Sequence, residues 1–364
     1  MSNLHDLHQV GQSLWLDNIT REILDDGTLK QYIDEFDVTG LTSNPTIFDK
    51  AISGSEAYDD AIAERAKSAQ SAEDLFVELA LDDLRRAAEL FEPAFKSSDK
   101  VDGWVSMELS PLLSADTKGS IESAKRIHRQ AATENLLVKI PGTPEGIPAI
   151  EESIFNGIPI NVTLLFSADQ YLAAAHAYLR GIERRMEAGL DPAVGSVASL
   201  FVSRWDKSSA EDLPEDLQNK LGIAMSHRAY RAYREMLASP RWKKLADAGA
   251  KPQRLLWAST GVKDPKARDT LYLEALAAPD TVNTIPEKTL KAFADHGKVG
   301  KAMAEDGGDC EAMLKNIEDA GVDIDSLAKQ LQKEGAESFV ESWNHLLKGV
   351  ADKAKKLGGE QLER

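Results

Sequence analysis

Short apolar runs recur along the chain, and longer stretches with helical periodicity separate them. Such runs are typical of strands in a parallel sheet that helices cover on both faces, because each strand then contacts apolar side chains on both sides. Roughly eight runs can be recognised, which is the number of strands that a closed parallel barrel requires. They lie at Leu14–Leu16, Val38–Leu41, Trp104–Leu109, Leu136–Ile140, Ile158–Phe166, Val197–Val202, Leu255–Ala258 and Thr281–Ile285.

The segments between these runs predict amphipathic helices. Apolar residues recur at helical spacing in Ser120–Asn135, and Ala168–Gly189 ends in a pair of arginines and a glycine. The alternation of strand and helix predicts βαβ units with right-handed crossovers. An open, doubly wound sheet would alternate in the same way, but no GxGxxG turn and no P-loop follows any of the runs. We therefore expect an α/β fold of the (β/α)8, or TIM, barrel class.

The pattern changes near residue 300. Beyond it no further strand is predicted, and Cys310–Leu357 has the periodicity of two or more helices. No internal repeat and no linker interrupts the chain. We expect residues 1–300 to form the catalytic barrel and residues 301–364 to form a C-terminal helical extension packed on its outside.

Composition and charge indicate a globular protein that avoids polyanions. The hydrophobic fraction is 42%, the charged fraction is 28%, and the formal net charge is -17. A negative excess repels nucleic acid and anionic membrane surfaces. The richest basic stretch, His227–Arg234, has arginines and tyrosines at spacings that an amphipathic helix explains. Neither nucleic acid nor membrane is therefore expected as a partner.

Cysteine usage and the N-terminal residues bear on the location of the protein. The single cysteine, Cys310, leaves no pair for an intramolecular disulfide or for a CxxC metal or redox site. The N-terminal residues lack a basic segment followed by an apolar one, and no apolar run approaches the ~18 residues of a membrane span. These features predict a cytoplasmic location.

Polar side chains interrupt or follow most of the apolar runs near their C-terminal ends, where barrel enzymes carry their catalytic groups. Because side chains alternate along a strand, Asn161 and Thr163 should point the same way, as should Ser199 and Phe201. Any one polar group could be a satisfied buried residue, but together they predict a functional site. The polar members are Asp17, Asn44, Glu108, Lys139, Asn161, Thr163 and Ser199.

Lys139 has the most specific chemistry of this set, since it lies inside the apolar segment LLVKIP. Burial disfavours the ammonium form of a lysine and supplies the free amine that attacks a carbonyl. The resulting iminium is an electron sink, which lets the adjacent carbon–carbon bond of a β-hydroxy ketone break without a metal. A lysine that extends from a strand end into solvent is the alternative interpretation.

Schiff-base chemistry also needs one group for the hydroxyl proton and one for dehydration of the carbinolamine. Asp17 and Glu108 are the carboxylates available at strand ends. A substrate phosphate would need cationic and hydroxyl donors at the barrel mouth, and Arg204, Ser259 and Lys263 suit that purpose. This set requires neither a cofactor nor a metal.

The segments around these residues resemble the transaldolase family. The similarity is carried, in the order of the family, by TSNPTIF at 42–48, VKIPGT at 138–143, NVTLLFS at 161–167, SLFVSR at 199–204 and WASTGVK at 257–263. It covers most of residues 13–297 and covers the C-terminal extension weakly. The resemblance implies a cofactor-free (β/α)8 barrel that transfers a dihydroxyacetone unit between sugar phosphates in the pentose phosphate pathway. Sedoheptulose 7-phosphate and glyceraldehyde 3-phosphate would give erythrose 4-phosphate and fructose 6-phosphate.

The resemblance also implies a role for each matching residue. Lys139 would be the Schiff-base lysine and Asp17 the acid–base group for bond cleavage, while Glu108 and Thr163 would position and activate the catalytic water. The remaining residues would bind the dihydroxyacetone hydroxyls (Asn44, Asn161 and Ser199) and the phosphate (Arg204 and Ser259).

Two positions depart from the family pattern. Many relatives have glycine where this chain has Ser203. Some relatives have an arginine shortly after the serine that matches Ser259, where this chain has Lys263.

Three other functions share part of this pattern. A class I aldolase such as fructose-6-phosphate aldolase has the same lysine but releases free dihydroxyacetone. Phe201 favours transfer, because the aldolase relatives have tyrosine there and are also shorter. A non-catalytic sugar-phosphate binder would be expected to lack one of Asp17, Glu108 and Lys139. A metal-dependent hydrolase would need histidines in an HxH or HExxH arrangement, which does not occur. Some members of the family are dimers, so a homodimer is the weak expectation for assembly.

Overall fold

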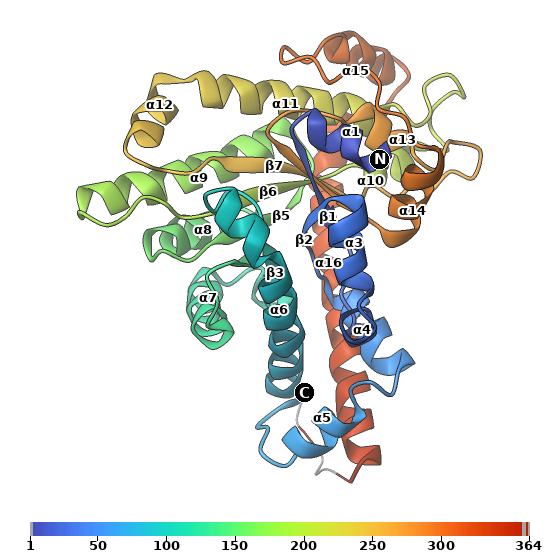
Figure 1. The fold of residues 1–364 in the computed structure, drawn as a ribbon. Coiled ribbons are helices and arrows are strands. Elements are labelled where there is room, and N and C mark those ends of the chain that lie inside the picture. Colours follow the sequence, from blue (N-terminus) through green and yellow to red (C-terminus); the bar gives the residue numbers. More distant parts are fainter. Residues whose placement is uncertain (1–2, 359–361, 363–364) are drawn as a thin grey trace.

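A computed structural model describes residues 3–358 and 362 of the chain. Eight parallel strands form a closed barrel in sequence order, and β8 closes onto β1 (Figure 1). The strands are β1 (Gln12–Leu16), β2 (Val38–Leu41), β3 (Val105–Glu108), β4 (Leu136–Pro141), β5 (Ile160–Leu165), β6 (Ser196–Phe201), β7 (Gln253–Ala258) and β8 (Thr281–Ile285). Each predicted apolar run overlaps one of these strands, and the predicted (β/α)8 barrel is confirmed.

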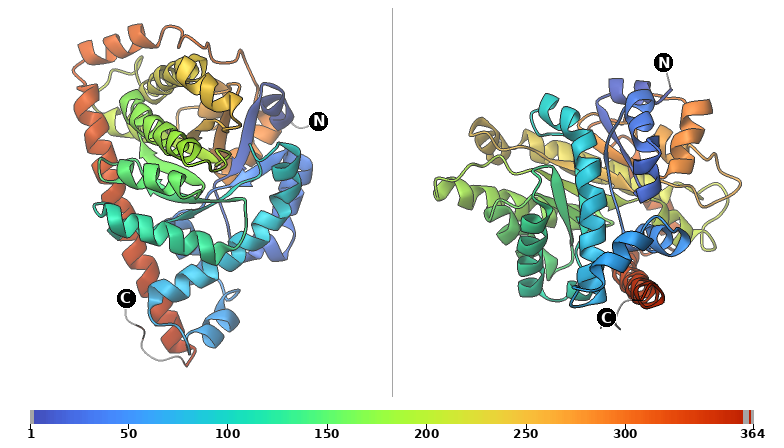
Figure 2. Two further views of the ribbon diagram at one scale, coloured as in Figure 1. Left: turned by 90° about the vertical axis from the view of Figure 1, so that its left-hand side faces the viewer. Right: turned by 60° about the horizontal axis from the view of Figure 1, so that its bottom comes forward.

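Helices connect the strands and cover the outside of the barrel (Figures 1 and 2). They are α1 (Asn3–Gln9), α2 (Arg21–Asp25), α3 (Thr28–Phe36), α4 (Pro45–Gly54), α5 (Asp59–Arg65), α6 (Ala72–Ser97), the 3-10 helix η1 (Pro111–Leu113), α7 (Thr117–Ala131), α8 (Gly146–Phe155), α9 (Ala168–Glu187), α10 (Ser203–Ser209), α11 (Leu221–Ala238), α12 (Pro240–Asp247), α13 (Leu271–Ala275), α14 (Glu287–His296), α15 (Cys310–Asp319) and α16 (Ile324–Lys356). In the part of the chain that the structure describes, no helix is both long and apolar enough to span a bilayer.

Helix α7 shows how local capping changes a predicted boundary. The periodicity predicted a helix over Ser120–Asn135, but α7 begins earlier because the Asp116 side chain accepts a hydrogen bond from the amide of Gly119. The helix ends at Ala131, since Ala132 adopts a left-handed conformation with a φ of 51°. The other predicted helix is α9, which begins at Ala168 as expected, after a capping box.

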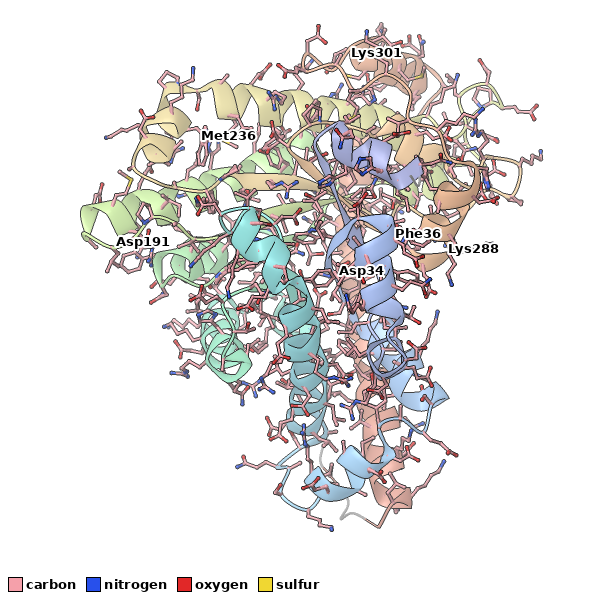
Figure 3. The ribbon with its side chains drawn as sticks, viewed as in Figure 1. Asp34, Phe36, Asp191, Met236, Lys288 and Lys301 are labelled. Carbon is pink, nitrogen blue, oxygen red and sulfur yellow. The ribbon has the colours of Figure 1, made fainter. Side chains whose placement is uncertain are left out.

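Charged side chains lie mainly on the outer surface. Those of Asp191 and Lys301 project from the periphery (Figure 3). The basic stretch His227–Arg234 lies within α11, as predicted, and its arginines form ion pairs with Asp280, Glu305 and Glu311. These cations are thus neutralised within the chain, which agrees with their interpretation as one face of a helix.

Strands β1 and β7 begin before the apolar runs that predicted them, at Gln12 and Gln253. Both glutamines are fully buried. Gln12 Nε2 donates to a backbone carbonyl at 2.7 Å, and Gln253 Nε2 donates to Ser196 Oγ at 2.9 Å. Buried polar side chains with such partners are compatible with a strand, but an apolar pattern does not detect them.

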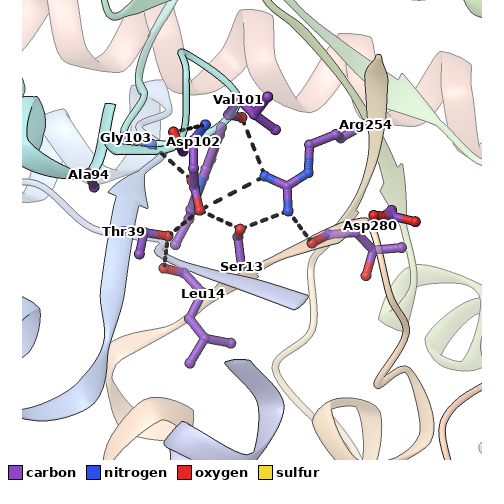
Figure 4. A network of polar contacts seen from close by, with 12 residues as sticks. Ser13, Leu14, Thr39, Ala94, Val101, Asp102, Gly103, Arg254 and Asp280 are labelled. Atoms are coloured by element: carbon purple, nitrogen blue, oxygen red, sulfur yellow. Dashed lines mark hydrogen bonds and ion pairs between the residues drawn. The ribbon is translucent and has the colours of Figure 1, made fainter. Parts of the chain in front are cut away.

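A buried polar network closes the N-terminal end of the barrel (Figure 4). The Asp102 carboxylate accepts hydrogen bonds from Ser13 Oγ and from Trp15 Nε1, the latter at 2.8 Å. Thr39 Oγ1 donates to the same carboxylate at 2.8 Å. Arg254 Nη1 lies 3.9 Å from it, and Arg254 Nη2 donates to Ser13 Oγ at 2.7 Å. One carboxylate before β3 therefore links β1, β2 and β7.

The C-terminal extension comprises α15 and the 33-residue α16, in agreement with the prediction of two or more helices. Helix α16 runs along one flank of the molecule (Figure 2) and contacts α4, α5, α6 and β5. Its buried stripe packs first on side chains at the barrel mouth and then on the cluster that includes α4 and α6. The stripe consists of Ile324, Ala328, Leu331, Gly335, Phe339, Trp343, Leu346, Leu347, Val350 and Ala354. The division of the chain at residue 300 stays a prediction.

The network at the barrel end generates a prediction about stability. Asp102→Asn keeps the size of the side chain but removes the charge that Arg254 faces, and it places an amide NH2 among hydrogen-bond donors. We expect the free energy of unfolding to fall by roughly 3 kcal/mol, as when one member of a buried ion pair is removed. Urea denaturation measures the loss. The control is Asp99→Asn, because Asp99 is an exposed residue whose ion pair with Lys251 lies near the surface. Similar denaturation midpoints for the two variants would contradict the assigned role.

Candidate active site

The register of the barrel places two predicted site residues beside Lys139. Glu108 of β3 and Asn161 of β5 are both paired with Lys139 of β4. Side chains in register point to the same face of a sheet, so the three converge inside the barrel. All three are less than a tenth exposed. Lys139 Nζ lies 2.7 Å from Glu108 Oε2 and donates to the carbonyl oxygen of Ser43 at 3.0 Å.

A cavity of about 350 Å³ opens at the carboxyl ends of the strands, and Lys139 forms part of its wall. Most of the predicted site residues line this single cavity, although they come from six different strands or the loops that follow them. They are Asp17, Asn44, Lys139, Thr163, Ser199, Phe201, Arg204, Ser259 and Lys263. The alternation argument for Ser199 and Phe201 is confirmed, since both face the cavity.

Asn161 lies beneath the cavity. Its Nδ2 donates to Ser106 Oγ at 3.1 Å, and its Oδ1 accepts a hydrogen bond from Ser199 Oγ at 2.7 Å. The amide is fully buried and has a partner at each end. It orients Ser199, and a direct bond to a substrate hydroxyl would require Asn161 to exchange one of these partners.

Asp17 follows β1, which is three strands from β4 in the barrel order, and it lines the same cavity as Lys139. Its Oδ1 accepts a hydrogen bond from Thr42 Oγ1 at 3.0 Å. Burial raises the pKa of Asp17, and the charge of Lys139, the Thr42 hydrogen bond and the charge of Lys263 offset only part of that effect. A carboxyl group with a raised pKa is suited to accept and return a proton.

Burial also raises the pKa of Glu108, against the lowering effect of Lys139, while the charge of Asp17 adds to the increase. The sequence predicted an amine sheltered by aliphatic neighbours, but the structure places a carboxylate within 2.7 Å of it. A proton can therefore pass directly from the Lys139 ammonium to Glu108.

Thr163 provides a hydroxyl that is available for hydrogen bonding. The side chain is fully buried and lines the cavity, and within the described part of the chain its Oγ1 has no hydrogen-bond partner. The next residue, Leu164, has a φ of 58°, where the register between β5 and β6 shifts. Buried hydroxyls normally have a partner, so Thr163 Oγ1 is a candidate to bind water or substrate.

Positive charge gathers at the mouth of the cavity, although the chain as a whole is acidic. Arg204, Lys263 and Lys50 all line the cavity. Arg204 forms no ion pair with any other described residue, and its Cζ lies 4.9 Å from the centroid of the Phe201 ring. Ser259, at a φ of 56°, lies at the same end of the cavity. This arrangement favours an anionic substrate group.

Several cavity residues were not identified from the sequence. They are Thr42, Thr46, Ile47, Lys50, Ala258, Gly261, Thr284, Pro286, Ser338 and Phe339. Lys50 lies on a helix, where it resembles any solvated lysine. Phe339 belongs to the apolar stripe of α16, and the periodicity of that stripe was the only available signal for its burial.

The raised pKa of Asp17 predicts a trade between stability and activity. Ionisation of this carboxyl opposes folding: the cost is fully present above the folded-state pKa and disappears below the unfolded-state pKa. Asp17→Asn removes the charge and keeps an acceptor for Thr42. We expect the variant to be inactive yet more stable than the parent by about 1 kcal/mol at about pH 7, with the difference vanishing near about pH 4. Denaturant midpoints at the two pH values test this expectation, and a destabilised variant at neutral pH would refute it.

Comparisons with known proteins agree with this geometry. The family model described as transaldolase/fructose-6-phosphate aldolase matches residues 14–350. The transaldolase of Renibacterium salmoninarum is 42% identical over an alignment of 360 positions that covers 96% of each chain. That of Thermobifida fusca is 42% identical over an alignment of 359 positions that covers 96% of this chain and 98% of the relative. Transaldolase 2 of Nostoc punctiforme is 37% identical over an alignment of 375 positions that covers 98% of each chain.

These matches extend beyond the segments that carry the resemblance in the sequence. The family match includes α15 and most of α16, which the motifs covered only weakly. The length of the chain is also that of the relatives named transaldolase. This chain belongs to the transaldolase/fructose-6-phosphate aldolase family.

Proposed function

We propose that this protein is a transaldolase that transfers a dihydroxyacetone unit between sugar phosphates through a Schiff base on Lys139. The observation that carries the proposal is the buried contact of 2.7 Å between Lys139 and Glu108, at a cavity whose mouth is lined by cations. Relatives named transaldolase that match over nearly their whole length support transfer rather than release. The proposed reaction converts sedoheptulose 7-phosphate and glyceraldehyde 3-phosphate to erythrose 4-phosphate and fructose 6-phosphate.

The first step is formation of the imine. Glu108 accepts the proton of the Lys139 ammonium, and the amine then attacks the C2 carbonyl of the ketose phosphate. The carbinolamine loses water after protonation of its hydroxyl, for which Glu108 now carries the proton. Thr163 Oγ1, which has no partner among the described residues, holds the departing water. The nitrogen gives one proton to the carbonyl oxygen and Glu108 gives the second, and both leave with the water, so this step takes no proton from solvent.

The second step is cleavage of the bond between C3 and C4. Asp17 accepts the proton of the C4 hydroxyl while the bonding electrons move into the iminium to form an enamine, and the aldose phosphate departs. The raised pKa of Asp17 fits a group that must take this proton and later return it to the acceptor. Asn44 and Ser199 line the cavity and would hold the dihydroxyacetone hydroxyls meanwhile. The Asn44 oxygen already accepts the amide of Ile47, so the amide nitrogen is the group that would donate.

The phosphate of donor or acceptor binds at the cationic end of the cavity. Arg204, Ser259 and Lys263 line that end and supply N–H and O–H donors. The sugar then extends from them toward Lys139. This placement explains how an acidic protein can bind an anionic substrate, since the local charge at the mouth differs in sign from the net charge.

The proposed cellular setting rests on the reaction, the single cysteine and the net charge. The reaction is one of the pentose phosphate pathway, and the unpaired Cys310 suits the reducing cytoplasm. Neither nucleic acid nor membrane is proposed as a partner, because the net charge of -17 disfavours both. A homodimer stays a prediction.

Reductive trapping tests the Schiff base. Borohydride added with fructose 6-phosphate should fix a dihydroxyacetone adduct on the peptide that contains Lys139, as identified by mass spectrometry. Lys139→Met should give neither adduct nor transfer, because it keeps the length of the side chain and removes the amine. Lys263→Met is the control for loss of a cavity lysine and should still be trapped at Lys139. An active sample with an unmodified Lys139 would refute the proposal.

A second assay separates transfer from release. With fructose 6-phosphate alone, the enzyme should form the enamine and stall, so that free dihydroxyacetone appears at least about 100-fold more slowly than product forms once erythrose 4-phosphate is added. Equal rates with and without the aldose acceptor would assign the chain to the aldolase branch of the family. The trapping experiment would succeed in either case.

A further inference from the structure

We propose that Phe339 of α16 is a positioning residue of this site, which fixes Arg204 for phosphate binding and shields the Lys139 imine from water. The inference rests on the proposed function, since it concerns the phosphate and the imine of that reaction. Phe339 lines the cavity and is 8% exposed. The centroid of its ring lies 6.0 Å from Lys139 Nζ and 5.9 Å from Arg204 Cζ. One aromatic ring from the end of the chain thus reaches both the reacting nitrogen and the phosphate cation.

The guanidinium of Arg204 lies between two rings. Its Cζ is 4.9 Å from the centroid of Phe201 and 5.9 Å from that of Phe339. Aromatic faces attract a guanidinium without using its N–H donors. Because Arg204 has no ion pair with another described residue, the rings hold it in place while its donors stay available for a phosphate. An arginine held in this way loses less side-chain freedom when the substrate binds.

Helix α16 is fixed to the strands that carry the catalytic groups. Gln332 Nε2 donates to the carbonyl of Leu164 at 2.9 Å and to that of Gly142 at 3.1 Å. Leu164 follows Thr163 in β5, and Gly142 follows the strand of Lys139. Farther along the helix, Lys353 Nζ donates to the carbonyl of Ile52 at 2.9 Å. Phe339 lies between these two attachments, so its position over the cavity is set by the helix as a whole.

Gly335 permits the close approach of this helix. It lies one turn before Phe339, and a Cβ added there would be 3.0 Å from Arg204 Nη1 and 2.9 Å from Leu164 Cδ2. Glycine is disfavoured within helices, so alanine at this position would improve the helix while crowding the arginine. The residue therefore serves the approach of α16 to Arg204, and it provides a second test of the proposal.

The ring of Phe339 also bears on the lifetime of the intermediate. The enamine on Lys139 is lost as free dihydroxyacetone when its carbon is protonated and water then adds to the resulting iminium. An apolar ring beside the nitrogen leaves water no hydrogen-bonding partner on that side. Phe201 borders the same cavity from β6. The two rings are the aromatic part of a wall whose other apolar residues are Ile47, Ala258 and Pro286.

The test compares acceptors that differ only in phosphate. Phe339→Leu keeps an apolar side chain but removes the aromatic face. We expect the KM for glyceraldehyde 3-phosphate to rise about tenfold, while the KM for glyceraldehyde changes less than about twofold. Gly335→Ala should shift the KM ratio in the same direction, with a melting temperature equal to or above that of the parent. Phe339→Ala should in addition raise the release of dihydroxyacetone per transfer several-fold.

Leu346→Ala is the matched control. Leu346 is a buried residue of the same helix that packs in the cluster away from the cavity, so its loss weakens the attachment of α16 without changing the wall. An unchanged KM ratio in Phe339→Leu, or an equal shift in Leu346→Ala, would overturn the inference. Absence of a borohydride adduct at Lys139 in the parent protein would instead overturn the proposed function, so the two failures can be told apart.

Discussion

The structure of the site depends on one buried contact, between the Lys139 ammonium and the Glu108 carboxylate. Neither charged group is stable alone in the interior of a barrel, because apolar neighbours do not replace the interactions with water that the group loses on burial. The register of β3 with β4 places the two side by side, and burial raises the pKa of Glu108 so that the proton can be shared. The remaining polar groups are arranged around this pair: Asp17 follows β1 and lines the same cavity, and Thr163 lies on β5, the strand next to that of Lys139.

The barrel accommodates these buried polar groups because its two ends have different roles. The Asp102 carboxylate closes the N-terminal end by accepting hydrogen bonds from the side chains of Ser13, Trp15 and Thr39 and from the amide of Gly103. The carboxyl end instead opens into the cavity, whose wall includes the buried hydroxyl of Thr163, which has no partner in the described chain. A buried hydroxyl without a protein partner is compatible with a site that binds water or substrate.

The sequence was sufficient to predict the barrel, because buried parallel strands are continuous apolar runs and the pattern needs no long-range information. It could not reveal that β1 starts at Gln12, because glutamine is a polar residue and the sequence does not show the hydrogen bond that allows it to be buried. Lys139 and Glu108 could each be singled out as polar groups at strand ends, but their contact follows from a register that periodicity does not determine. Phe339 was missed because its function depends on packing against Arg204, far away in the sequence.

Transfer and release differ only in whether the enamine adds to an aldose or is hydrolysed. The family to which this chain belongs can therefore contain both activities on one barrel. The chemistry near Lys139 is common to both outcomes, and the discrimination must therefore come from the wall of the cavity. In this chain the wall is completed by α16, which is bonded to the ends of β4 and β5. In the proposed mechanism, Lys139 is positioned by the barrel strands alone, whereas protection of its intermediate requires α16 to dock.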